Sequence, residues 1–266
     1  MSIDELKQRL HALGYLTEAA MLKGTAKTVA TSLKRFQRFN GLEPTGKLDT
    51  ATERLLVAPL RCSLPDFVTD DTGCRWPLEK MTAVSYHVRL QLPGITPAVA
   101  AATFDQACRQ WEAVCGIRFR KLATSRGANI AAKSGAGRKL FLDGAGGTLA
   151  WSYMPCNATP TVQLAQMYDQ AERWSQHMAL AVMCHEIGHA IGLPHGKPGQ
   201  LMAPYYNADV TMPQKGDTLE AVKRYGAPKA AMTQAATQVV RVARPAVLEI
   251  RDEDDKLVTT LTFAKD

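Results

Sequence analysis

The sequence predicts an α+β fold in which a small helical domain precedes a larger domain of strands and helices. Two patterns indicate this organisation. Apolar residues recur at helical spacing through the first 57 residues, whereas from about Trp76 apolar and polar residues alternate, as in a strand with one buried face. Helices and strands in separate stretches of a chain are typical of the α+β class.

The N-terminal domain is expected to cover residues 1–58 and to contain three helices. Three leucines at helical spacing predict the first helix, which Gly14 ends. Apolar residues around Leu33 predict the second helix, and a short third helix is expected over 50–56 after several Gly and Pro residues.

The second domain is expected over residues 76–226, beginning with a strand over 83–90. Thr96 followed by Pro97 is a favourable N-cap and first-turn pair for a helix whose apolar stripe is best explained as core. The remaining expected elements are short strands at 117–119 and 129–132 and a long helix over 175–191.

The end of the chain is expected to be separate from this domain. Residues 227–245 are rich in Ala, Thr and Gln and are interpreted as a linker. Residues 246–266 contain two apolar stretches around an acidic turn, which predicts a β-hairpin.

Composition excludes some functions and leaves others open. The chain holds 32 Lys and Arg against 25 Asp and Glu, a net charge of +7, which we interpret as solvated basic helix faces rather than a nucleic-acid surface. No apolar stretch is long enough to span a bilayer, so no membrane span is expected. The first residues do not resemble a Sec-type signal. The six cysteines form neither a CxxC zinc pattern nor a dense disulfide scaffold.

The motif with the most chemical content runs from His185 to His195. Residues four apart lie on the same face of a helix, so His185 and His189 can bind one Zn²⁺ together. Gly192 lets the chain leave the helix in a conformation that other residues resist, which brings His195 round as the third ligand. Three neutral ligands leave a fourth position open, as in catalytic zinc sites.

Glu186 follows the first ligand directly and is the expected catalytic residue. Zinc lowers the pKa of a water molecule towards about 7 and polarises the scissile carbonyl, while Glu186 takes the proton and passes it to the leaving amine. The pattern therefore predicts a zinc metalloendopeptidase. The other histidines, His11, His87 and His177, have no partners at ligand spacing and are interpreted as ordinary hydrogen-bonded residues.

Residues 201–206, LMAPYY, resemble the Met-turn of metzincins followed by the Pro-x-Tyr wall of the matrixin specificity pocket. The resemblance implies a twisted mixed sheet with an active-site helix, and it places Met202 beneath the imidazoles without binding the metal. It also implies a cleft in which an extended substrate adds as an antiparallel strand. The implied cleft residues are Leu149, Ala150, Pro204 and Tyr206.

Residues 60–66, LRCSLPD, resemble the matrixin cysteine switch, PRCGxPD. The resemblance implies that Cys62 supplies a thiolate to the fourth zinc position in a latent form and that Arg61 pairs with Asp66 to hold the loop. Residues 59–75 are thus interpreted as the switch and activation segment.

Departures from the switch pattern are expected to make latency leakier, because Leu60 replaces a proline and Ser63 replaces a glycine. The helical domain resembles the peptidoglycan-binding-like domain that forms the pro-region of many matrixins.

Residues 141–150 and 168–174 resemble two further matrixin segments, FDGxGGxLAHA and FDxxExW. The resemblance implies a structural Ca²⁺, and the alternative is an acidic turn with solvated carboxylates. The implied calcium ligands are the carboxylates of Asp143, Asp169 and Glu172 and the backbone oxygens of Gly144, Gly146 and Thr148. Trp151 and Met167 stand where two histidines of the family's second, structural zinc belong, so one zinc is expected and Trp151 is expected to fill that space.

The leading hypothesis is a latent, monomeric endopeptidase acting on protein or peptide substrates, with an extracellular or cell-surface location implied by the resemblance. An alternative is a cell-wall-targeted metallopeptidase or binding protein that attaches to peptidoglycan through its N-terminal domain. A third is a structural or adhesive protein with a degenerate zinc site, against which Glu186 argues, because a dead site needs no general base.

Overall fold

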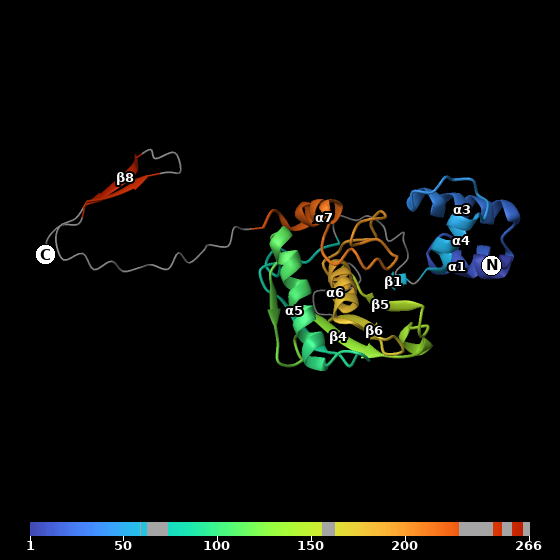
Figure 1. Cartoon of the computed structure of the whole chain (residues 1–266), viewed down its shortest axis with the longest axis horizontal. Helices are drawn as coiled ribbons and strands as arrows, with labels where there is room; N and C mark the ends of the chain where they lie inside the picture. Colours follow the sequence, from blue (N-terminus) through green and yellow to red (C-terminus); the bar gives the residue numbers. More distant parts are fainter. Residues whose placement is uncertain (59, 63–73, 156–162, 229–246, 252–256, 263–266) are drawn as a thin grey trace. The chain divides into compact units, whose positions relative to one another are not determined.

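The computed structural model describes residues 1–58, 60–62, 74–155 and 163–228 with their side chains, and 247–251 and 257–262 as backbone. The chain divides into two compact units, Met1–Lys229 and Ala230–Asp266 (Figure 1).

The N-terminal part of the first unit is a helical bundle with its own apolar core. Its helices are α1 (Ile3–Ala12), α2 (Glu18–Lys23), α3 (Ala26–Phe39) and α4 (Thr50–Val57). Leu10, Phe36 and Leu56 are fully buried in this core, as expected for apolar residues repeating at helical spacing. The three expected helices are α1, α3 and α4. The sequence did not predict α2, because this short helix buries none of its residues and depends on capping of the Ala20 amide by the Thr17 side chain.

The larger part of the unit is built on a six-stranded sheet of order β1-β5-β6-β4-β2-β3. All neighbouring strands are parallel except β5 and β6, so the predicted mixed sheet is confirmed. The strands are β1 (Leu60–Cys62), β2 (Val84–Arg89), β3 (Phe119–Lys121), β4 (Ile130–Gly135), β5 (Thr148–Ser152) and β6 (Leu164–Asp169). A short 3-10 helix, η1 (Arg138–Leu140), precedes β5.

One predicted strand is shifted along the chain. The strand expected at 117–119 begins at Phe119, which pairs with Val84. Ile117 is fully buried in the core instead, because its apolar side chain gains more from burial than from a place in an edge strand.

Three helices complete this domain: α5 (Pro97–Val114), α6 (Gln176–Ala190) and α7 (Lys215–Tyr225). Thr96 and Ser175 accept hydrogen bonds from backbone amides in the first turns of α5 and α6, as their N-cap positions predict. Helices α5 and α6 lie side by side beside the sheet (Figure 1), and the Trp111 indole donates to the Cys184 carbonyl over 2.8 Å. Helix α6 is thereby held rigidly inside the core.

The second unit contains the antiparallel pair β7 (Val247–Arg251) and β8 (Leu257–Thr262), in line with the predicted hairpin. The acidic turn between the strands and most of the expected linker lie outside the described residues.

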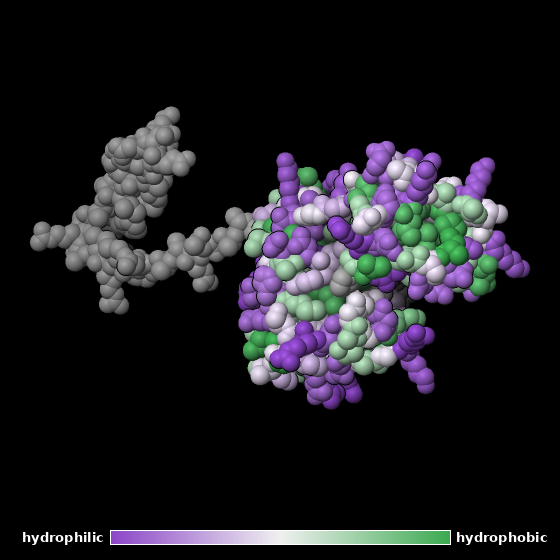
Figure 2. Space-filling model, turned by 45° about the vertical axis from the view of Figure 1, so that its right-hand side comes forward, coloured by the Kyte–Doolittle hydropathy of each residue, from purple (hydrophilic) through white to green (hydrophobic). Residues whose placement is uncertain are grey.

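The visible surface mixes hydrophilic and hydrophobic residues, and the hydrophobic ones gather on the right-hand part of the view in Figure 2. Among the described residues, none of the helices has the length and apolar character needed to cross a membrane.

Candidate active site

Four side chains meet in the core: two from α6, one from the turn that follows it, and one from the distant strand β1. The ligand atoms of Cys62, His185, His189 and His195 all lie within 4.8 Å of one another, and all four residues are buried. This group combines the three predicted histidines with the predicted switch cysteine, and the set of three nitrogens and one sulfur suits Zn²⁺.

The turn after α6 brings the third histidine to the first two. Gly192 adopts a positive φ of 91°, and a Cβ at this position would overlap the carbonyl oxygen of Cys74. Only glycine combines this backbone conformation with so close a neighbour. The ring centroid of His195 consequently lies 5.5 Å from that of His185 and 4.9 Å from that of His189.

Backbone carbonyls orient the first two imidazoles for metal binding. Nδ1 of His185 lies 2.8 Å from the Leu201 carbonyl oxygen, and Nδ1 of His189 lies 2.8 Å from the Leu193 carbonyl oxygen, so each Nδ1 carries the proton and donates. The two Nε2 atoms then face each other at 3.0 Å with their lone pairs, an arrangement that a shared cation stabilises. Burial lowers the pKa of both histidines well below the usual value, which keeps them neutral. The residues therefore fit a zinc ion.

Met202, the expected Met-turn residue, packs against α6, and its place beneath the imidazoles stays a prediction. A Cβ on Gly188 of α6 would collide with the Met202 sulfur, so the methionine packs directly against the helix that carries the histidines. Met202 is 1% exposed, and its thioether serves here as packing.

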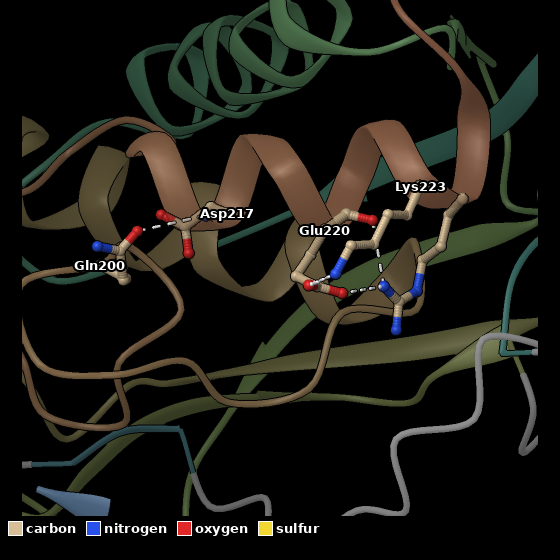
Figure 3. Close-up of polar contacts among 5 residues, drawn as sticks. Gln200, Asp217, Glu220 and Lys223 are labelled. Atoms are coloured by element: carbon tan, nitrogen blue, oxygen red, sulfur yellow. Dashed lines mark hydrogen bonds and ion pairs between the residues drawn. The ribbon is translucent and has the colours of Figure 1, made fainter.

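Asp217 holds the Met-turn in place and was missed in the sequence. Its carboxylate accepts hydrogen bonds from the amides of Leu201 and Met202 over 2.8 and 3.1 Å, and from the Gln214 amide over 2.8 Å. The Gln200 side chain accepts from the Asp217 amide in turn (Figure 3). In the sequence, Asp217 could be recognised only as an acidic residue in the first turn of α7, a position that indicates helix capping and not a contact with the Met-turn.

Strand β1 lies between β5 and the segment that follows Met202. Leu60 and Cys62 pair with Thr148 and Ala150 of β5 in parallel, and the Arg61 amide donates to the Pro204 carbonyl over 2.7 Å on the opposite side. The cleft residues expected from the sequence, Leu149, Ala150, Pro204 and Tyr206, therefore surround the segment that contains Cys62.

Cys62 and Glu186 face each other at the reacting end of the cleft. The Cys62 thiol donates to Oε2 of Glu186 over 3.7 Å, and both side chains are fully buried. Burial raises the pKa of Glu186 well above the usual value, and the Cys62 thiol opposes part of that shift. Within the described residues, Oε1 of Glu186 has no hydrogen-bond partner, so the carboxyl retains capacity to exchange a proton.

Arg61 is completely buried against the wall of the cleft. Its guanidinium donates to the backbone carbonyls of Leu201, Asn207 and Val210 and lies over the ring of Tyr206. Burial lowers its pKa to about 10, so it stays charged at neutral pH. The expected partner, Asp66, lies outside the described residues, so their pairing stays a prediction. The carbonyl contacts were not predicted, because backbone acceptors carry no side-chain signature.

The residues expected to bind calcium lie close together, but their carboxylates accept hydrogen bonds from the backbone amides of the loop. Asp169, Glu172 and Asp143 accept hydrogen bonds from the amides of Gly144, Gly146 and Thr148 respectively, over 2.6 to 3.3 Å. The expected carbonyl ligands therefore present N–H groups to the carboxylates here. Calcium binding remains a proposal on this geometry.

Trp151 occupies the space beside Met167, its cross-strand neighbour. The indole donates to the Leu140 carbonyl over 2.6 Å and makes edge contacts with Phe141 and Tyr153. Neither Trp151 nor Met167 has a metal-binding group of the usual kind. An aromatic cluster thus joins β5 to the loop before it.

The segment after the activation region supports the end of α6, which the sequence did not indicate. The Trp76 indole donates to the Ala190 carbonyl over 2.8 Å, and the Tyr225 hydroxyl donates to the Ile191 carbonyl over 2.7 Å. Both acceptors are terminal carbonyls that a helix leaves without partners. Cys74, just before this segment, is disulfide-bonded, whereas Cys62, Cys108, Cys115 and Cys184 are free.

The remaining histidines behave as predicted. His11, His87 and His177 each place a ring nitrogen within 2.6 to 3.1 Å of a backbone carbonyl oxygen. None of them joins the histidine cluster in the described part of the chain.

A helix that carries two histidines and a glutamate, a glycine turn to a third histidine and a methionine beneath them define the zinc metallopeptidases of the metzincin type. Residues 75–226 match the Matrixin family, which is more than half of the chain, and residues 2–56 match a putative peptidoglycan binding domain. The chain belongs to the matrixin family.

Individual relatives agree with this assignment. The chain is 28% identical to the hatching enzyme of Paracentrotus lividus, with 79% of this chain and 36% of that protein covered. It is 27% identical to stromelysin-1 of Mus musculus, with 78% of this chain and 45% of that protein covered. It is 31% identical to the macrophage metalloelastase of Rattus norvegicus, with 74% of this chain and 43% of that protein covered. The chain thus spans less than half the length of each of these relatives.

Proposed function

We propose that this protein is a latent zinc-dependent endopeptidase that hydrolyses peptide bonds in proteins. The observation that carries the proposal is the meeting of Cys62, Glu186 and three histidine imidazoles at one point in a cleft already occupied by an extended segment. A structural or adhesive protein would not need this set of groups, since Glu186 has no packing role that an apolar residue could not serve.

His185, His189 and His195 would hold the zinc ion, and the ion would supply a Lewis acid that acidifies water and polarises the scissile carbonyl. Glu186 takes the proton of the attacking water on its carboxylate and passes it to the leaving amine. Cleft backbone on both sides aligns the peptide.

Latency follows from the position of Cys62. Strand β1 fills the cleft, and the thiol takes the place next to Glu186 that a water molecule needs. Cleavage within the activation segment releases β1 and opens the site. We place the activated enzyme outside the cell or on its surface, as a monomer with a calcium ion near Asp143, on the resemblance to matrixins.

The test is hydrolysis of an unfolded protein substrate by the full chain after cleavage of the activation segment. We expect activity that is lost on removal of zinc, restored by added zinc and absent in Glu186→Gln. Activity that persists equally in Glu186→Gln with zinc removed would refute the proposal.

A second candidate function is attachment to bacterial cell walls, favoured by the match of residues 2–56 to a putative peptidoglycan binding domain. Sedimentation of the full chain with purified sacculi tests it, with the Glu186→Gln variant used to prevent degradation. The absence of co-sedimentation would restrict the helical domain to a role in latency.

A further inference from the structure

Arg61 fills a buried space next to Cys62 and Glu186, and its contacts there indicate which side chains this pocket accepts. Strand β1 lies in the cleft as an extended peptide would, with Cys62 beside Glu186 and Arg61 next along the strand. The Arg61 side chain leaves the strand on the wall side, where it is completely buried.

Strand direction assigns this pocket to one substrate position. Strand β1 runs parallel to β5, whereas a substrate that adds to β5 as an antiparallel strand runs in the opposite direction. With the scissile carbonyl at the position of Cys62, the residue at the position of Arg61 follows the scissile bond. The pocket therefore receives the first residue of the new N-terminal fragment.

The pocket is built for hydrogen-bond donors. Among the described residues, the guanidinium donates to three backbone carbonyls, of Leu201, Asn207 and Val210, with the last two 3.2 and 3.5 Å from Nη2. The Tyr206 ring lies below, with its centroid 5.9 Å from the guanidinium carbon, within the range of cation–π attraction. An apolar side chain would withdraw the donor that Arg61 gives to the Val210 carbonyl, and it would leave the Leu201 and Asn207 carbonyls with only their contacts to the His185 ring and the Val210 amide, which is unfavourable.

We propose that this pocket selects an arginine side chain immediately after the scissile bond, so that the substrates are proteins cleaved before arginine. This inference rests on the proposed endopeptidase function and narrows its substrate class. A guanidinium suits the site better than an ammonium, because its planar fork can donate to several carbonyls at once and stack on the tyrosine. Arg61 uses the same preference to anchor the latent segment.

The first arm of the test measures hydrolysis. The full-length Arg61→Ala/Cys62→Ala variant leaves the pocket free and removes the thiol, and Glu186→Ala in that background gives the zero level. Four quenched peptides differ only after the scissile bond, where they carry arginine, lysine, citrulline or leucine. We expect kcat/KM for arginine to exceed that for leucine and for neutral, isosteric citrulline by roughly tenfold or more. Equal or faster cleavage before leucine would overturn the inference while leaving the endopeptidase function intact.

The second arm of the test measures how tightly the pocket holds residue 61 and does not depend on hydrolysis. In the zinc-loaded full chain, the reaction rate of Cys62 with a thiol reagent reports how firmly β1 is docked, because the other free cysteines are buried in the core. Arg61→Met, an unbranched side chain without donors, should react several-fold faster than the unmodified chain, and Arg61→Lys should lie between. Equal rates for Arg61→Met and the unmodified chain would contradict the pocket preference. If no peptide is hydrolysed in the first arm, the proposed function fails, and this second arm still decides the pocket preference.

Discussion

The thiol of Cys62 lies 3.7 Å from the carboxylate of Glu186, although the two residues are 124 positions apart in the chain. This contact joins the segment that blocks the cleft to the residue that would move the proton. In the proposed mechanism, latency and catalysis compete for one location, and a change that withdraws Cys62 is expected to expose Glu186 to water.

Asp217 should be a positioning residue for the Met-turn. Asp217→Asn replaces one of the carboxylate oxygens that accept the Leu201 and Met202 amides, which leaves a buried group unsatisfied. We expect the free energy of unfolding to fall by about 1–3 kcal/mol. Lys223→Gln on the same helix is the control, because the Lys223 side chain is 62% exposed and its ion pair with Glu220 should contribute less than about 1 kcal/mol. Urea denaturation measures both, and equal losses would argue against the role given to Asp217.

Gly192 should tolerate no side chain. Gly192→Ala combines a positive φ with overlap of the Cys74 carbonyl, so we expect a loss of stability of about 2–4 kcal/mol and reduced zinc retention. Gly199→Ala is matched, because Gly199 also has a positive φ, 83°, but meets no atom within 4 Å. That control should lose only about 1 kcal/mol. Similar melting temperatures for the two variants would mean that the Cys74 contact does not shape the turn.

Alkaline pH should destabilise the fold through buried thiols. Burial raises the pKa of Cys115 from about 9 to about 11, so between these pH values the unfolded chain loses a proton that the folded chain keeps. The stability attributable to this group is fully present below pH 9 and falls as pH rises, by about 2.7 kcal/mol in all. Cys115→Ala should flatten the decline of unfolding free energy between pH 9 and 11. An unchanged slope in that variant would contradict the effect of burial.

The metal ligands could be predicted because they belong to one helix and the turn that follows it, where spacing determines geometry. Cys62 was recognisable because its neighbours form a motif. The supports of the site were not, since Asp217 accepts from backbone amides and Trp76 and Tyr225 cap carbonyls, and any sequence can supply such partners. Arg61 was expected to hold the loop through Asp66, but its contacts with backbone carbonyls were not predicted.

The same reasoning explains the fold. Helix α6 could be placed from the ligand spacing of His185 and His189, although it is buried on all sides and has no apolar stripe. Strand β2 was predicted from alternation, although its first three residues are all buried. Helix α2 buries none of its residues and left no such pattern, and β3 moved by two residues because Ile117 is taken into the core.

The central claim is that Cys62 blocks a working peptidase site, and the most direct measurement is the initial rate of peptide hydrolysis by the intact chain and by Cys62→Ala, with zinc counted in each. Cys62→Ala/Glu186→Gln supplies the background. We predict that Cys62→Ala is faster than the intact chain by at least about tenfold, that the double variant is inactive, and that each protein holds one catalytic zinc. Equal, negligible rates for all three proteins at full zinc occupancy would contradict the account.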